Sequence, residues 1–164
     1  LPAAAQGHGW TVYDAAGIRI LVMNLLGTVF MEPLASPFET ADAILEKCRG
    51  GYDVALVDFH AEATSEKLAR YLTGRVSAVW GTHTHVATAD CRILGGHTGF
   101  ITDLGMVGSA DGILGVKSEA VLHKFLVKTP VRFETEHGNE GATGALFTVV
   151  TGSGKCISAE SVSF

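Results

Sequence analysis

The sequence predicts an α/β fold with an antiparallel element at each end. Two continuous apolar segments, residues 53–59 and 76–80, have the pattern of strands that are buried on both faces. Helix-like segments alternate with these strands in the middle of the chain. Such alternation is typical of a parallel sheet covered by helices.

The N-terminal region predicts a pair of strands followed by a loop. Residues 10–14 and 18–24 have strand character, and residues 15–17 form the turn between them. Apolar side chains alternate along the second of these strands, at Ile18, Ile20 and Val22. The following residues, 25–36, are interpreted as a loop.

The first helix is predicted to begin after Ser36. Ser36 is a suitable N-cap, Pro37 suits the first helical position, and Glu39 completes a capping box. Gly50-Gly51 is expected to end this helix. Its apolar side chains recur at helical spacing: Phe38, Ala41, Leu45 and Cys48.

The remaining elements are predicted from shorter patterns. A second helix is expected over 61–71, a short strand over 100–102, and a third helix over 119–127 that stops near Pro130. The last strands are expected at 131–136, 146–151 and 156–164.

Composition limits the classes of function. The 164 residues fit one domain or a large part of one, and the net charge of −5 argues against binding of extended nucleic acid. A small phosphorylated substrate is compatible with this charge if a metal supplies positive charge locally. The three cysteines form no CxxC pair, which predicts a reducing, cytoplasmic location. The most apolar stretch, 18–31, is interrupted by Arg19 and Asn24, so no membrane association is expected.

Three histidines follow the two buried strands. His60 comes directly after one strand, and His83 and His85 follow the next. Sites in open α/β sheets form at the carboxyl ends of the strands. In an extended segment, residues i and i+2 point the same way, so His83 and His85 are expected to face one cavity. Imidazole suits zinc, iron and manganese, and we therefore predict that these three residues are metal ligands.

Two carboxylates accompany the histidines. Asp58 lies on the same side of its strand as His60, where it is suited either to bind metal or to orient an imidazole through a hydrogen bond. Glu62 is a candidate to contact substrate or to hold a ligand, although a polar residue opening a helix is an equal interpretation. Cys91 is interpreted as a structural thiol rather than as half of a Cys–His pair.

Several motifs resemble the YmdB family of calcineurin-like metallophosphoesterases. The resemblance covers nearly the whole chain. Its specific segments are Val57-Asp58-Phe59-His60-Ala61-Glu62-Ala63-Thr64-Ser65-Glu66-Lys67, Gly81-Thr82-His83-Thr84-His85-Val86 and Ile101-Thr102-Asp103-Leu104-Gly105-Met106. Val22-Met23-Asn24-Leu25, Asp111-Gly112-Ile113-Leu114-Gly115 and Pro130-Val131-Arg132-Phe133 fit as well.

The resemblance implies a four-layer α/β/β/α sandwich with two divalent metal ions, iron or manganese. It implies a cytoplasmic homo-oligomer that hydrolyses small phosphodiesters, such as 2′,3′-cyclic nucleotides, by a metal-activated hydroxide. By the motif match, His60 and His83 would bind one metal and His85 the other.

The family pattern also includes ligands that have no match in this sequence. Members carry an N-terminal half that supplies an Asp, a bridging Glu with an adjoining Asn, and an Asn-His pair. No Asn-His dipeptide occurs in this sequence. Residues 1–164 are therefore expected to form the C-terminal portion of a single metallophosphoesterase domain. The alternatives are a non-catalytic metal-binding or regulatory fragment and a hydrolase with one metal bound by His60, His83 and His85.

Overall fold

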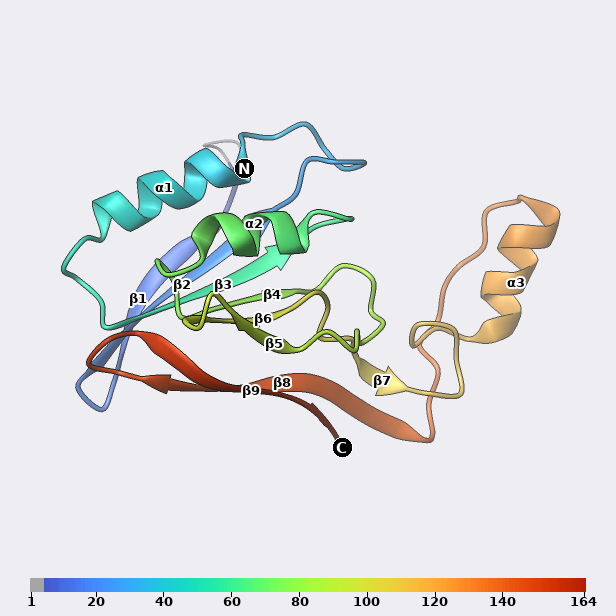
Figure 1. Cartoon of the computed structure of the whole chain (residues 1–164). Helices are drawn as coiled ribbons and strands as arrows, with labels where there is room; N and C mark the ends of the chain where they lie inside the picture. The colour runs from blue at the N-terminus through green and yellow to red at the C-terminus, as the bar shows by residue number, and fades with distance from the viewer. Residues whose placement is uncertain (1–4) are drawn as a thin grey trace.

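A six-stranded sheet forms the centre of the molecule (Figure 1). The computed structural model describes residues 5–164. The spatial order of the strands is β1-β2-β3-β4-β6-β5, in which β2, β3, β4 and β6 are parallel and the edge strands β1 and β5 are antiparallel. The strand bounds are Trp10–Ala15 (β1), Ile18–Leu26 (β2), Val54–His60 (β3), Ala78–Gly81 (β4), Arg92–Leu94 (β5) and Thr98–Ile101 (β6). The predicted α/β class, with antiparallel elements at its ends, is confirmed.

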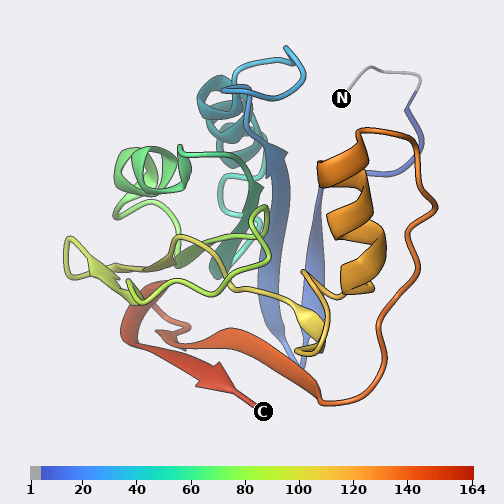
Figure 2. The ribbon, with the colours of Figure 1, turned by 90° about the vertical axis from the view of Figure 1, so that its right-hand side faces the viewer.

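Two helices, α1 (Pro37–Lys47) and α2 (Ser65–Leu72), cover one face of this sheet (Figures 1 and 2). The Ser36 hydroxyl accepts the backbone N–H of Glu39 at 3.5 Å, so α1 begins where its sequence predicts. Helix α2 begins four residues later than the predicted range 61–71. The chain turns first at Ala63, which has a φ of 51° and so cannot continue a right-handed helix.

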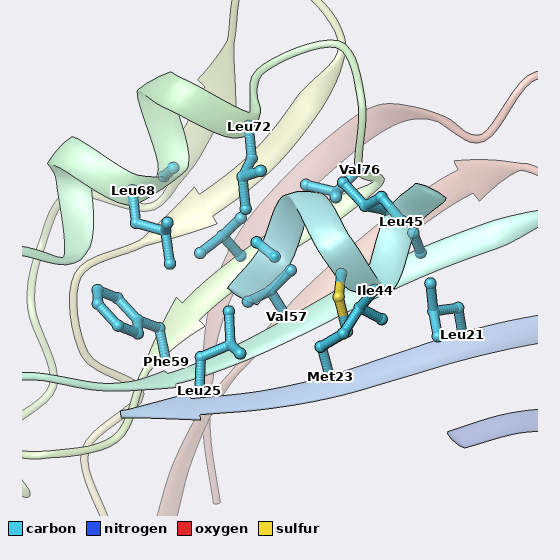
Figure 3. Packing of buried hydrophobic residues seen from close by; sticks show 14 of the residues in the cluster. Leu21, Met23, Leu25, Ile44, Leu45, Val57, Phe59, Leu68, Leu72 and Val76 are labelled. Carbon is cyan, nitrogen blue, oxygen red and sulfur yellow. The ribbon is translucent and has the colours of Figure 1, made fainter. Parts of the chain in front are cut away.

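The hydrophobic core lies between these helices and the sheet (Figure 3). On β2 the buried side chains are the alternate set Leu21, Met23 and Leu25, whereas Ile18, Ile20 and Val22 lie on the opposite, less buried face. The core also includes Val57, Phe59, Ile44, Leu45, Leu68, Leu72 and Phe100. The parallel strands are therefore anchored from the helix side, which leaves their opposite face free to carry polar groups.

A second sheet of three strands packs against that opposite face. It contains β7 (Val107–Ser109), β8 (Glu140–Val150) and β9 (Lys155–Ser163) in that order. Phe147 of β8 stacks on Trp80 of β4 with ring centroids 6.5 Å apart. Gly99 of β6 permits this approach, since a Cβ there would lie 2.5 Å from the Phe147 ring. Helices, central sheet and second sheet are thus successive layers of the expected sandwich.

Helix α3 (Ser118–Val127) is the element with the least packing. None of its residues is buried, and it stands apart from α1 and α2 in both views (Figures 1 and 2). Leu122, Phe125 and Leu126 are 52%, 66% and 80% exposed. No helix in residues 5–164 is long and apolar enough to cross a membrane.

The C-terminal strands differ from the sequence prediction. Residues 131–136 do not form a strand, because their pairing to the preceding loop is limited to an isolated bridge between Val116 and Thr135. Strand β8 starts at Glu140 rather than at 146, since its first residues pair with β7. Strands β5 and β7 were not predicted. Each has three residues, which is too short for a periodic signal.

The core predicts different losses in the free energy of unfolding for two leucine-to-alanine substitutions. Leu68→Ala, at a fully buried position on α2, should lower the free energy of unfolding by about 2–5 kcal/mol. Leu126→Ala, at the exposed position on α3, should change it by less than about 0.5 kcal/mol. Urea denaturation measures both, and equal losses in the two variants would contradict this description of the core.

Candidate metal centre

The register between β3 and β4 sets the position of the candidate site. The two strands are parallel, and Phe59 pairs with Gly81 at their carboxyl ends. His60 is the last residue of β3 and still pairs with Leu26 of β2, whereas Thr82 follows the end of β4 beside it and His83 comes next. Gly81 is needed for this packing, because a Cβ there would lie 1.8 Å from the Thr102 carbonyl oxygen. Two strand ends thus deliver polar side chains to one edge of the sheet.

The imidazoles of His60 and His83 lie against each other. Nε2 of His60 is 3.2 Å from Nδ1 of His83, and the two rings meet edge-on with centroids 4.9 Å apart. The other nitrogen of His83, Nε2, lies 3.1 Å from Oε2 of Glu62. The His83 and Glu62 side chains are 30% and 42% exposed, so the pair is open to solvent and to ligands.

A chain of hydrogen bonds holds the ring of His60. The Thr82 hydroxyl donates to Oδ1 of Asp58 at 3.0 Å, and Nδ1 of His60 lies 3.2 Å from the Thr82 oxygen. Asn24 donates to the other Asp58 oxygen at 2.8 Å. Because the Thr82 proton is directed to Asp58, its oxygen accepts from Nδ1–H of His60. This tautomer leaves a lone pair on Nε2, the nitrogen that faces His83.

His85 is placed differently from its prediction. Residues 83–86 form bends rather than an extended segment, and His85 has a φ of 62°. The premise that His83 and His85 point the same way as neighbours on a strand is therefore wrong. Strand pairing ends at Gly81, after which the Thr84 hydroxyl accepts the N–H of Val86 and turns the chain. The His85 side chain is exposed and has no hydrogen bond or ion pair to the rest of residues 5–164.

The separation of His60 and His83 suits a shared metal ion. Two ligand nitrogens that are each about 2.1 Å from one tetrahedral ion lie about 3.4 Å apart, close to the 3.2 Å seen here. The donor set is nevertheless incomplete within residues 5–164, where no three His, Cys, Asp or Glu side chains cluster as a metal site requires. The two imidazoles therefore fit a metal, and further ligands must join them.

Cys91 is not suited to nucleophilic chemistry. It is partly buried, and burial raises the pKa of its thiol above the ordinary value. A raised pKa lowers the fraction of reactive thiolate at neutral pH. The interpretation of Cys91 as a structural thiol agrees with this environment.

Two further groups of this site were not assigned roles from the sequence. Thr82 joins Asp58 to His60, and Asp103 accepts the backbone N–H of Thr84, between His83 and His85. Both follow strands of the central sheet at its carboxyl edge, Thr82 after β4 and Asp103 after β6. Their positions after predicted strands, at 76–80 and 100–102, were the signal that could have identified them.

Comparisons with known proteins give a consistent result. A family model described as “YmdB-like protein” matches residues 1–162. The 2′,3′-cyclic-nucleotide 2′-phosphodiesterase of Bacillus subtilis (strain 168) is 42% identical over 163 residues, which are 98% of this chain and 62% of that protein.

Two solved structures are also similar. A hypothetical protein from Thermus thermophilus superposes with a TM-score of 0.88 at 36% identity, covering 99% of this chain and 64% of that one. A structure described as a novel phosphatase from Mycoplasma pneumoniae gives a TM-score of 0.85 at 32% identity, covering 96% and 57%. The chain thus spans 57–64% of the length of these relatives.

The ring contact yields a prediction about metal binding. His83→Ala should weaken Zn²⁺ binding by more than about 100-fold in isothermal titration calorimetry, because it removes one of two adjacent imidazoles. The melting temperature should change little, since the side chain is outside the core. His123→Ala, on the exposed helix α3, is the matched control and should bind like the wild type. Unaltered Zn²⁺ binding by His83→Ala would exclude His83 as a ligand.

Proposed function

The chain belongs to the YmdB-like family, and on that premise we propose that it carries part of the active site of a metal-dependent phosphodiesterase. The proposed substrates are small phosphodiesters such as 2′,3′-cyclic nucleotides, as the name of the Bacillus subtilis relative suggests. The observation that supports this most directly is the contact between His60 and His83 at the carboxyl edge of the sheet.

The proposed cofactor is a pair of divalent ions, iron or manganese. His60 and His83 would hold one ion and His85 the other. When bound, such ions polarise the phosphate oxygens and supply a hydroxide near neutral pH. They also supply the positive charge that a phosphate needs, in a chain whose own net charge is −5.

The surrounding residues orient the imidazoles. Asp58 acts through the Thr82 hydroxyl, so we assign it to the hydrogen-bond network that fixes the His60 tautomer rather than to direct metal binding. Glu62 fixes the opposite end of the ring pair by its contact with His83. Because the Glu62 side chain is 42% exposed, it is also placed to meet a substrate or a water molecule.

The remaining ligands are proposed to come from outside the matched region of the relatives. Two metals need about four to six ligands each, which three imidazoles cannot provide. The chain covers 62% of the Bacillus subtilis relative, and we propose that an N-terminal half of the fold provides the other ligands. The exposed apolar side chains of α3, including Phe125 and Leu126, are a surface that such a half could cover.

Two further proposals concern location and assembly. All three cysteines are free thiols, as is usual in the reducing cytoplasm. A homo-oligomer is proposed as the assembly because the family resemblance implies one.

A second candidate function is a non-catalytic metal-binding or regulatory module. The observation that favours it is the incomplete donor set within residues 5–164. Supplying the missing half separates the two candidates, because only the first gains hydrolysis together with metal.

The proposal predicts that residues 1–164 alone hydrolyse bis(p-nitrophenyl) phosphate or 2′,3′-cyclic AMP hardly at all. Joining them to the N-terminal part of the Bacillus subtilis relative, in cis or as a separate chain, should restore both metal content and turnover. Activity assays and elemental analysis measure the two effects.

The alternatives predict different results in this experiment. A joined protein that binds metal but turns over neither substrate would support the non-catalytic module. Robust turnover by residues 1–164 alone, lost on His85→Ala, would contradict the proposed incompleteness of the site.

A further inference from the structure

One buried carboxylate accepts a backbone hydrogen bond from the segment that carries His83 and His85. Asp103, two residues beyond β6, is 1% exposed. Its Oδ2 accepts the backbone N–H of Thr84 at 2.7 Å, and its Oδ1 accepts the N–H of Gly105 at 2.8 Å. Thr84 is the residue between the two histidines, so this bond fixes the peptide group that joins His83 to Thr84, immediately before His85.

We propose that Asp103 is the positioning residue of the candidate metal centre, which sets the directions of His83 and His85 without touching either ring. The proposal rests on the proposed function in one respect, the binding of metal by those imidazoles. Its structural part, the control of the backbone at Thr84, stands independently.

The far end of the segment is fixed by the same residue through Thr88. The Thr88 N–H donates to the Asp103 carbonyl oxygen and the Asp103 N–H donates to the Thr88 hydroxyl oxygen, both at 3.1 Å. The Thr88 hydroxyl in turn donates to Oδ1 of Asp90 at 2.6 Å. Asp103 therefore holds both Thr84 and Thr88, and the segment between them carries His85 in its left-handed conformation.

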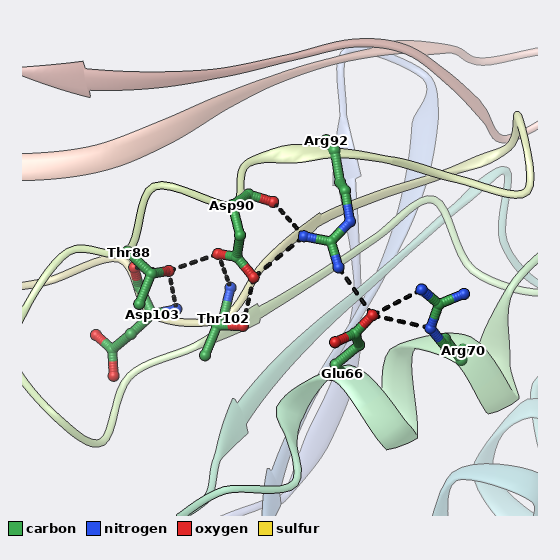
Figure 4. Close-up of polar contacts among 7 residues, drawn as sticks. All are labelled: Glu66, Arg70, Thr88, Asp90, Arg92, Thr102 and Asp103. Carbon is green, nitrogen blue, oxygen red and sulfur yellow. Dashed lines mark hydrogen bonds and ion pairs between the residues drawn. The ribbon is translucent and has the colours of Figure 1, made fainter.

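Asp90 connects this arrangement to the rest of the fold (Figure 4). Its carboxylate accepts the N–H and the hydroxyl of Thr102 at 3.0 and 2.6 Å, and it pairs with Arg92 at 3.2 Å. Arg92 reaches Glu66 on α2 at 2.8 Å. The partly exposed Arg92–Glu66 pair adds little by itself, and Asp90 is 29% exposed, whereas the Asp103 carboxylate is buried and its hydrogen bonds are shielded from water.

A carboxylate is required at position 103 because both of its oxygens accept backbone N–H groups. Asparagine has nearly the same shape but replaces one oxygen with an NH₂ group, which would direct a donor at an N–H. Either Thr84 or Gly105 would then lose its acceptor. Changes to groups that orient metal ligands typically weaken metal binding by about 10–100-fold.

The test is a Zn²⁺ titration of the 164-residue chain by isothermal titration calorimetry. Asp103→Asn should bind Zn²⁺ about 10–100-fold more weakly than the wild type. The matched control is Asp42→Asn, which also removes a hydrogen-bonded carboxylate, but one that pairs with Tyr71 and Arg75 away from the histidine segment. Asp42→Asn should bind like the wild type, and wild-type affinity in Asp103→Asn would overturn the proposal.

A second measurement needs no metal. The Thr84 amide should be protected from hydrogen exchange in the wild type and in Asp42→Asn, and unprotected in Asp103→Asn. An unprotected Thr84 amide in the wild type would overturn the proposal. Absence of Zn²⁺ binding by the wild-type chain would agree with the incomplete donor set within residues 5–164, and the Thr84 amide would then decide the role of Asp103.

A further variant covers the case in which Asp103→Asn does not fold. Thr88→Val keeps the shape of the side chain and removes the hydroxyl that bonds Asp103 and Asp90. It should bind Zn²⁺ several-fold more weakly than the wild type, and unchanged affinity in this variant would overturn the proposal.

Discussion

The parallel pairing of β3 with β4 is the constraint on which the candidate site depends. The backbone bonds of this pair align Phe59 with Gly81, and that alignment brings Asp58 and His60 of β3 next to Thr82 and His83. A shift of one residue would turn the side chains of β3 to the opposite face, with Asp58 and His60 in the apolar core and Phe59 on the polar side. The core against α1 and α2 therefore also determines the site, because burial of Val57 and Phe59 directs Asp58 and His60 to the opposite face of the sheet.

The two faces of the central sheet have different roles: one forms the core, and the other carries the candidate site. The face toward the helices is closed by large apolar side chains, whereas the other carries Asn24, Asp58 and His60, with Trp80 in register with Asp58 on the neighbouring strand and stacked on Phe147 of the second sheet. Since successive residues of a strand alternate between faces, a seven-residue strand such as β3 serves both purposes. Polar residues of the site can therefore be substituted without removing side chains from the core.

Much of this arrangement could be predicted from local patterns, and the exceptions have physical causes. The strands before His60 and His83 were evident because buried parallel strands are continuously apolar, and Ser36 marked the start of α1. The direction of His85 could not be predicted. It depends on a hydrogen bond from the Thr84 backbone to Asp103, nineteen residues away in the chain, and no local pattern encodes such a bond. Residues 131–136 likewise have a strand-like composition but form no strand, because their pairing is limited to an isolated bridge.

Helix α3 has a consequence for cooperativity. A ten-residue helix with no buried side chain is marginal in water, because few tertiary contacts offset the entropy of ordering it. Its coil-to-helix equilibrium is therefore only loosely coupled to that of the central sheet, and the chain should behave as two cooperative units of unequal stability. A surface that packs against Phe125 and Leu126 would couple the two units, so that they unfold as one. Ordering of α3 and assembly would then occur in a single thermodynamic transition.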